Sequence, residues 1–279
     1  MARYRRPMGR YGPGSFAAGT FGPRFAAHLL QAGPSMEEHY RQAAEIINEA
    51  RTVICLTGAG ISVESGIPDF RSACGLWEKY DPMEYAHIDA FRRNPEKIWK
   101  MVFELIELTT KAAPNPAHLA LAELERRNIL RSIITQNIDN LHQAAGNRKV
   151  IEFHGNASRL DCLNCGQSYG ASEFELNGTP PRCRECSAVL KPSVVFFGEA
   201  IPMQALAESE RLSNLADAIL VVGTSAVVYP ASSIPFIVKS NGGRVSEMNL
   251  ETTGLTNSIT DVFIQGPAGR TLPELIACL

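Results

Sequence analysis

Short apolar runs alternate with stretches of helical periodicity along most of the chain. The first run, "TVICLTGAG" at residues 52–60, is followed by "RSIITQN", "KVIEFHG", "SVVFFGE", "DAILVVGT", "GRVSEMNL" and "DVFIQG". These runs are short and rich in β-branched residues, which is typical of buried strands. Segments such as "PAHLALAELERR" and "MQALAESERLSNLA" lie between them and space their apolar residues as helices do. The alternation predicts an α/β fold built on a doubly wound parallel sheet.

The first 35 residues differ from this pattern. They hold many Gly and Pro, no acidic residue, and five arginines: Arg3, Arg5, Arg6, Arg10 and Arg24. Such a composition cannot bury a core, so we predict a disordered extension over residues 1–35. An organellar transit peptide and a misassigned start, with Met36 as the true one, are two further interpretations. From Ser35 onward, "MEEHYRQAAEIINEA" has a capping residue, acids in its first turn and helical spacing, and predicts a helix.

The overall composition excludes some classes of partner. The formal net charge is −2 and 45% of the residues are hydrophobic, so no global charge draws the chain to nucleic acid or lipid. No apolar run reaches the roughly 18 residues that a membrane-spanning helix needs. We therefore expect a cytoplasmic protein with no direct nucleic-acid contact and no membrane contact. Nothing in the pattern requires an oligomer.

Four of the seven cysteines form two CxxC pairs, Cys162 with Cys165 and Cys183 with Cys186, with seventeen residues between the pairs. This spacing is typical of a zinc ribbon, in which two CxxC turns complete a tetrahedron of thiolates. Disulfides or free thiols are the alternative, which a reducing compartment disfavours. Four thiolates leave no open position for water, so the zinc is predicted to be structural. The surrounding Gly, Asn and Pro indicate a small inserted module at residues 156–191.

A glycine loop, "GAGIS" at residues 58–62, follows the first apolar run. Its backbone N–H groups could face a pyrophosphate. The loop lacks the third glycine of the dinucleotide fingerprint, since Val63 stands there, and no GK[ST] follows, so a plain tight turn is an open alternative. The segment "SGIPDFR" comes next and brings Asp69 and Arg71 to the mouth of the loop, which favours a ligand clamp.

Seven motifs occur in one order: "GAGISVESGIPDFR", "TQNIDNLH", "EFHG", the two CxxC pairs, "VVFFGE", "VVGTSAVVYP" and "MNLE". In this the chain resembles the sirtuins, the NAD-dependent protein deacylases, of bacterial type. The resemblance runs from about residue 45 to the end. It implies a catalytic domain over residues 36–279 with a Rossmann-like sheet and an inserted zinc module. NAD and an acyl-lysine peptide would enter a cleft between the two.

The resemblance also implies roles for particular residues. His154 would be the general base, with Asn137 and Asp139 as further catalytic residues. The residues implied to bind NAD are Gly58, Ala59, Gly60, Ile61, Ser62, Ser65, Asp69, Phe70, Arg71, Trp77, Gln136, Asn137, Ile138, Asp139, Gly223, Thr224, Ser225, Asn249, Leu250, Glu251 and Ala268. Nicotinamide would be released, and the acyl group would leave as O-acyl-ADP-ribose, so that NAD is consumed.

The histidines and the acid of these motifs each have a structural alternative. A lone histidine at a strand end is commonly a core residue, but no other candidate base occurs in the motifs, which favours His154. His118 and His142 are interpreted as packing residues. Asp139 could instead be an acid at the N-terminus of a helix.

The substrate is expected to be an acyl-lysine peptide that adds as a strand between "SVVFFGE" and "VVYPA". Val195 and Phe197, with Val228 and Tyr229 opposite, are the substrate residues that the resemblance implies. Relatives that remove dicarboxylic acyl groups carry a Tyr and an Arg three residues apart on the helix after "NPEKIW", where this chain has Val102 and Leu105. A succinyl carboxylate would have no partner there. The chain therefore looks more similar to deacetylases than to desuccinylases.

Two other functions remain open from the sequence. A mono-ADP-ribosyltransferase would use the same activated ribose. A non-catalytic module that binds NAD or ADP-ribose would not need His154, Asn137 and Asp139. The catalytic residue set favours the deacylase.

Overall fold

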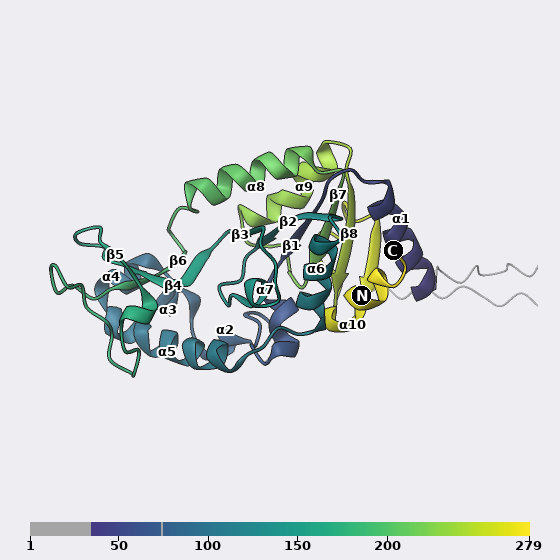
Figure 1. Ribbon diagram of the computed structural model, residues 1–279. Coiled ribbons are helices and arrows are strands. Elements are labelled where there is room, and N and C mark those ends of the chain that lie inside the picture. Colours follow the sequence, from purple (N-terminus) through teal and green to yellow (C-terminus); the bar gives the residue numbers. More distant parts are fainter. Residues whose placement is uncertain (1–34, 74) are drawn as a thin grey trace, which may run out of the picture. The chain divides into compact units, whose positions relative to one another are not determined.

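The structure is a computed structural model that describes residues 35–73 and 75–279. Its centre is a six-stranded parallel sheet in the order β3-β2-β1-β7-β8-β9 (Figure 1). The strand bounds are β1 Val53–Thr57, β2 Leu130–Thr135, β3 Val150–Glu152, β7 Ala218–Val222, β8 Arg244–Asn249 and β9 Val262–Gln265. The strand order reverses between β1 and β7, which is where doubly wound sheets bind ligands. The predicted doubly wound sheet is confirmed.

Helices cover both faces of this sheet because its strands are buried on both sides. Alternate residues of β1 belong to different cores: Val53 and Cys55 to one, Ile54 and Leu56 to the other. The first core includes residues of α1 (Met36–Glu49), α6 (Pro116–Arg126) and α10 (Ala268–Ile276). The second core includes residues of α8 (Met203–Leu215) and α9 (Ile234–Ser240). The continuous apolar runs of the sequence follow from this double burial.

Local signals in the sequence fix the helix starts. Ser35 accepts a hydrogen bond from the backbone N–H of Glu38 at 3.2 Å and begins α1. Asn115 begins α6 with a capping box, in which the His118 ring also accepts from the Asn115 backbone N–H at 3.3 Å. A 3₁₀ helix, η1 (Ala59–Ser65), follows β1 directly and carries the glycine loop.

A second, three-stranded sheet in the order β5-β4-β6 lies beside a group of short helices (Figure 1). Its strands are β4 Gly155–Asp161, β5 Ser168–Gly170 and β6 Lys191–Val194, and the helices are α2 Leu76–Lys79, α3 Pro82–Tyr85, α4 Ile88–Arg93 and the longer α5 Pro95–Lys111. The remaining short helices are α7 Leu141–Ala144, η2 Ala171–Glu173 and η3 Ala231–Ser233.

One apolar run was assigned to the wrong sheet. The sequence pattern grouped "SVVFFGE" with the parallel strands, but β6 pairs antiparallel with β4 and ends at Val194. The chain enters β6 directly from the cysteine module, so it is already beside β4, the strand that enters that module. Residues 195–199 continue beyond β6 into a cleft.

The small sheet shares its core with helices from an earlier part of the chain. Ile98 and Trp99 of α5 are fully buried in a cluster with Leu160 and Leu190. The Trp99 indole donates to the Leu190 carbonyl at 2.8 Å. Two separate segments, residues 76–111 and 155–194, therefore build this unit together.

The predicted disordered extension covers residues 1–35, of which residues 1–34 lie outside the described residues and Ser35 caps α1. Within the described part, no helix is long and apolar enough to cross a membrane.

The core assignment is tested by two leucines of α6. Leu121 is 0% exposed in the first core, whereas Leu119 is 53% exposed on the same helix. We predict that Leu121→Ala lowers the free energy of unfolding by about 2–5 kcal/mol. Leu119→Ala, the matched control, changes it by less than about 0.5 kcal/mol. Denaturant titration measures both, and equal effects would contradict the assignment.

Candidate functional site

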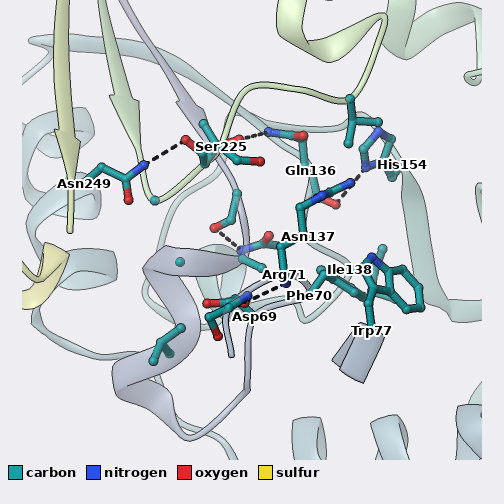
Figure 2. A pocket seen from close by; sticks show the side chains of 18 of the residues that line it. Asp69, Phe70, Arg71, Trp77, Gln136, Asn137, Ile138, His154, Ser225 and Asn249 are labelled. Carbon is teal, nitrogen blue, oxygen red and sulfur yellow. Dashed lines mark hydrogen bonds between the residues drawn. The ribbon is translucent and has the colours of Figure 1, made fainter. Parts of the chain in front are cut away.

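A cavity of about 1090 Å³ lies at the carboxyl ends of β1, β2, β7 and β8 and reaches the small sheet (Figure 2). Most residues that the sequence singled out line it. They are Gly58, Ala59, Gly60, Asp69, Phe70, Arg71, Trp77, Gln136, Asn137, Ile138, His154, Val195, Phe197, Gly223, Thr224, Ser225, Val228, Tyr229, Asn249, Leu250, Glu251 and Ala268. The fold thus brings together segments that are far apart in sequence.

Four of the singled-out residues lie outside the cavity lining. Ile61 is fully buried in the first core. The Ser65 hydroxyl accepts from the Asn115 amide at 3.0 Å. Ser62 and Asp139 lie one layer behind the wall, where the Ser62 hydroxyl donates to the Asp139 carboxylate at 2.7 Å. The Ser62 hydroxyl in turn accepts from the Asn137 side chain at 3.2 Å. Ser62 and Asp139 are therefore connected to the cavity wall through Asn137.

The floor of the cavity is a contact between two backbones. The N–H of Gly60 donates to the carbonyl of Gly223 at 2.8 Å, and the N–H of Gly58 donates to the carbonyl of Val222 at 3.1 Å. A Cβ atom added to Gly223 would lie 2.3 Å from the Ile61 nitrogen, and Gly223 has a φ of +60°. Only glycine fits here, because any side chain would force the two loops apart.

Two amide side chains are fixed above this floor. The Gln136 amide donates to the Thr224 hydroxyl at 3.0 Å, and the Asn137 amide donates to the carbonyl of Gly58 at 3.1 Å. Asn137 is buried, and its backbone N–H also donates to the Thr135 hydroxyl at 3.1 Å. Their positions are therefore set by the ends of β1 and β7.

His154 lies in the turn between β3 and β4 and reaches the cavity (Figure 2). Its Nδ1 is 3.1 Å from the carbonyl oxygen of Gln136. A carbonyl oxygen only accepts, so Nδ1 carries the proton and Nε2 keeps its lone pair in the neutral ring. Burial lowers the pKa of His154, and the bond to Gln136 opposes the shift only in part. The neutral ring, the form that can take up a proton, is favoured.

The two histidines interpreted from the sequence as packing residues are buried behind the cavity. His118 and His142 are 0% and 1% exposed, and their ring centroids are 5.0 Å apart. Burial lowers the pKa of His118 to about 4 and that of His142 to about 3. His142 Nε2 is 2.9 Å from the Thr57 hydroxyl, which donates to Thr135. Both rings are neutral packing residues that support the strand ends.

One end of the cavity is apolar and aromatic. The rings of Phe70 and Trp77 are 5.1 Å apart, and those of Trp77 and Phe197 are 6.3 Å apart. Met101 and Leu105 of α5 complete this end. Val102 does not line the cavity but packs in the core of the small unit. Met101 was missed, although its spacing of four residues from Leu105 places it on the same helix face.

The mouth of the cavity carries an arginine side chain that does not pair with the neighbouring Asp69. Asp69 accepts from the backbone N–H groups of Arg71 and Ser72 at 2.8 and 2.7 Å. Its carboxylate is therefore used to hold the local turn. The Arg71 side chain is exposed, lines the cavity and has no ion pair among the described residues.

The four paired cysteines gather at one point of the small unit. Their Sγ atoms all lie within 4.8 Å of one another, with Cys162 to Cys186 at 3.4 Å and Cys165 to Cys183 at 3.5 Å. A tetrahedron of thiolates around zinc has S···S separations of about 3.8 Å. The cluster fits one structural zinc ion with no open coordination position.

The comparisons identify the family. The model of the Sir2 family matches residues 58–230. An NAD-dependent protein deacylase of Thermococcus kodakarensis is 48% identical over 240 residues, covering 84% of this chain and 93% of the relative. NAD-dependent protein deacylase 2 of Archaeoglobus fulgidus is 49% identical, covering 86% and 96%. This chain belongs to the Sir2 family.

Solved structures are similar throughout the described fold. A Sir2 homologue in complex with NAD has a TM-score of 0.79 at 43% identity and covers 85% of this chain and 92% of that one. Sir2Af2 bound to a myristoylated histone peptide has a TM-score of 0.75 at 42% identity, covering 87% and 96%. The predicted family, fold and class of enzyme are confirmed. The relatives named above are archaeal and not bacterial.

The zinc assignment predicts a specific loss on substitution. Cys183→Ser should reduce bound zinc from about one ion per chain to nearly none, because three thiolates hold zinc poorly. It should also lower the melting temperature, since Cys183 is part of the small unit's core. Cys278→Ser is the control, because Cys278 is exposed and outside the cluster. Elemental analysis that found full zinc in Cys183→Ser would contradict the assignment.

Proposed function

We propose that residues 36–279 form an NAD-dependent protein-lysine deacylase that prefers apolar acyl groups and uses His154 as its general base. The observation that carries the proposal is the His154 ring itself. Its Nδ1 is held by the Gln136 carbonyl, its pKa is lowered by burial, and Nε2 is left as a base in a cavity lined by Asn137 and Phe197.

NAD supplies an activated ribose when nicotinamide leaves, and the chain's part is to bind, orient and exclude water. Asn137 and Ile138 would contact the carboxamide end. Arg71, which has no ion-pair partner in residues 35–73 and 75–279, would neutralise phosphate charge. The loop after β7, including Ser225, and the loop that begins at Asn249, the last residue of β8, would hold the adenosine end. The Asn249 amide donates to the Thr224 carbonyl at 2.9 Å, which ties these two loops together.

His154 would remove a proton from a ribose hydroxyl when that hydroxyl attacks the acyl-bearing carbon. A buried neutral imidazole suits this step, because it accepts a proton without first losing one to solvent. Asp139 and Ser62 would act indirectly, by fixing the Asn137 amide through the bonds described above.

The acyl group would lie in the aromatic end of the cavity. Phe70, Trp77 and Phe197 shield it from water, and Met101 and Leu105 offer no polar partner. A dicarboxylic acyl group would bury its charge unpaired. The extent of this apolar end also supports acyl chains longer than acetyl. The relative Sir2Af2 binds a myristoylated peptide.

An acyl-lysine peptide would add as a strand between residues 197–199 and 227–229. Gly198 and Val227 have no backbone hydrogen bond to another described residue, so both edges can pair with an extended chain. Tyr229 and Val227 are 81% and 63% exposed, which leaves room for that chain.

The four clustered thiols also favour a reducing compartment such as the cytoplasm.

The first test is nicotinamide release from NAD with and without an acetyl-lysine peptide. We expect release to depend on the peptide, and deacylation by His154→Ala to fall by at least about a hundredfold, since a general base contributes this much. His39→Ala is the control: His39 is another partly buried histidine, but it lies on α1 and outside the cavity lining. Unchanged deacylation by His154→Ala would contradict the assignment.

The lowered pKa of His154 predicts the pH dependence. The base works only when unprotonated, and burial moves its pKa below the ordinary value of about 6.5. As pH falls, kcat/KM should therefore stay constant through 6.5 and decline only below it. A pH–rate profile whose acid limb lies above 6.5 would overturn this expectation.

Acyl preference follows from the apolar end. We expect acetyl-lysine to be preferred over succinyl-lysine by at least about tenfold in kcat/KM, because the succinyl charge has no partner. Leu105→Arg should narrow this ratio by placing a cation in the cavity. Thr110→Arg adds the same charge at an exposed position of α5 and should not. Equal wild-type activity on the two peptides would contradict the preference.

A further inference from the structure

A buried carboxylate lies beneath the end of the cavity assigned above to adenosine. Glu247 of β8 is 0% exposed and immediately precedes Met248 and Asn249, which line the cavity. It lies on the same strand face as Val245, the face covered by the second core. A carboxylate in such a place requires strong hydrogen bonds, because burial without partners is costly.

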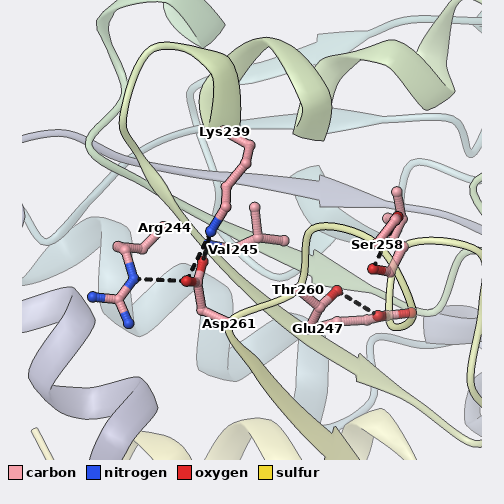
Figure 3. A network of polar contacts seen from close by, with 8 residues as sticks. Lys239, Arg244, Val245, Glu247, Ser258, Thr260 and Asp261 are labelled. Carbon is pink, nitrogen blue, oxygen red and sulfur yellow. Dashed lines mark hydrogen bonds and ion pairs between the residues drawn. The ribbon is translucent and has the colours of Figure 1, made fainter.

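Three threonine hydroxyls supply those bonds, and all three come from one loop after β8. Thr253 donates to Oε1 at 2.6 Å. Thr256 and Thr260 donate to Oε2 at 2.7 and 2.9 Å. Figure 3 shows the bond from Thr260 beside the separate ion pairs of Asp261 with Lys239 and Arg244. Glu247 therefore accepts hydrogen bonds from hydroxyls, whereas the nearby Lys239 and Arg244 pair with Asp261.

The direction of two of these bonds is fixed by the loop backbone. The Thr256 hydroxyl accepts from the backbone N–H of Thr253 at 2.9 Å, and the Thr253 hydroxyl accepts from the backbone N–H of Leu255 at 3.1 Å. Each of these two hydroxyls donates its single proton to Glu247 and accepts a hydrogen bond from a backbone N–H. The site consequently needs a side chain that only accepts, which an ionised carboxylate does.

The same loop forms a wall of the cavity. Leu250, Glu251, Thr252 and Thr253 line it, and Leu250 is 56% exposed. Further along, Leu255 is buried in the second core, so the loop has an apolar anchor of its own. Loss of the Glu247 bonds should loosen residues 250–256 locally without unfolding the chain.

We propose that Glu247 is a positioning residue for NAD: its carboxylate orders the loop of residues 250–256 so that this loop forms the adenosine wall of the cavity. The inference rests on the proposed function, since it concerns the same cavity. Glu247 does not touch the ligand and acts through Thr253 and its neighbours.

The test is Glu247→Gln, which keeps the shape but replaces one accepting oxygen with a donor. The NH₂ group of the glutamine would face a donating hydroxyl whose orientation is fixed by the loop backbone, so two donors would meet. We expect the Kd for ADP-ribose, measured by calorimetry, to rise roughly tenfold. KM for NAD should rise similarly, while kcat at saturating NAD and KM for the peptide stay near wild type. Hydrogen exchange at the Thr253 and Leu255 amides should quicken.

Asp217→Asn is the matched control. Asp217 is another hydrogen-bonded carboxylate, but it accepts from the backbone N–H groups of Arg51 and Thr52, at 3.0 and 2.9 Å, at the opposite end of the sheet. It should lower stability without changing the Kd for ADP-ribose. Thr256→Val removes one donor to Glu247 and leaves the carboxylate in place. It should also raise the Kd for ADP-ribose, and it provides the test if Glu247→Gln does not fold.

The outcomes distinguish a failure of the Glu247 role from a failure of the proposed function. If wild type binds ADP-ribose, and Glu247→Gln and Thr256→Val bind it as tightly as wild type does, the positioning role is wrong and the proposed function stands. An equal loss of affinity in Asp217→Asn would make the effect one of general stability, which also overturns the inference. If wild type itself fails to bind ADP-ribose, the proposed function fails and the inference with it.

Discussion

The contact between the loop after β1 and the loop after β7 is the constraint on which the site depends. Gly58, Gly60 and Gly223 allow the two backbones to touch, with N–H···O distances of 2.8 and 3.1 Å. The contact occurs where the strand order reverses, so each loop can diverge toward its own side of the sheet. It closes the floor of the cavity and brings hydrogen-bonding groups of β1, β2 and β7 to one edge.

The polar side chains of the site take their positions from that floor. Asn137 is attached to Gly58, Gln136 is attached to Thr224, and the Gln136 carbonyl then holds His154. His154 also begins the connection to the small sheet, since the Val195 N–H donates to its carbonyl at 2.8 Å. His154, the proposed base, is thus held by backbone contacts between the wall assigned to NAD and the apolar end, and its neutral form is favoured by burial.

Features that depend on local residue types could be predicted from the sequence. The strands are apolar throughout because both faces are buried, and the cysteine pairs have the spacing of a zinc ribbon. Most of the motif residues line one cavity. Features that depend on tertiary pairing could not be predicted. The run "SVVFFGE" resembles a buried parallel strand, and only its pairing with β4 shows the second sheet. Glu247 is a single acid in a strand until the fold brings three threonines to it.

We expect the acyl group to be transferred to ADP-ribose and His154 to serve this transfer. The most direct measurement supplies NAD labelled in its adenosine part together with an acetyl-lysine peptide, and follows the label in a single turnover. We expect all of the label in free O-acetyl-ADP-ribose, in an amount equal to the nicotinamide released and to the peptide deacetylated. Label attached covalently to protein, or nicotinamide release without acetyl-ADP-ribose, would contradict it.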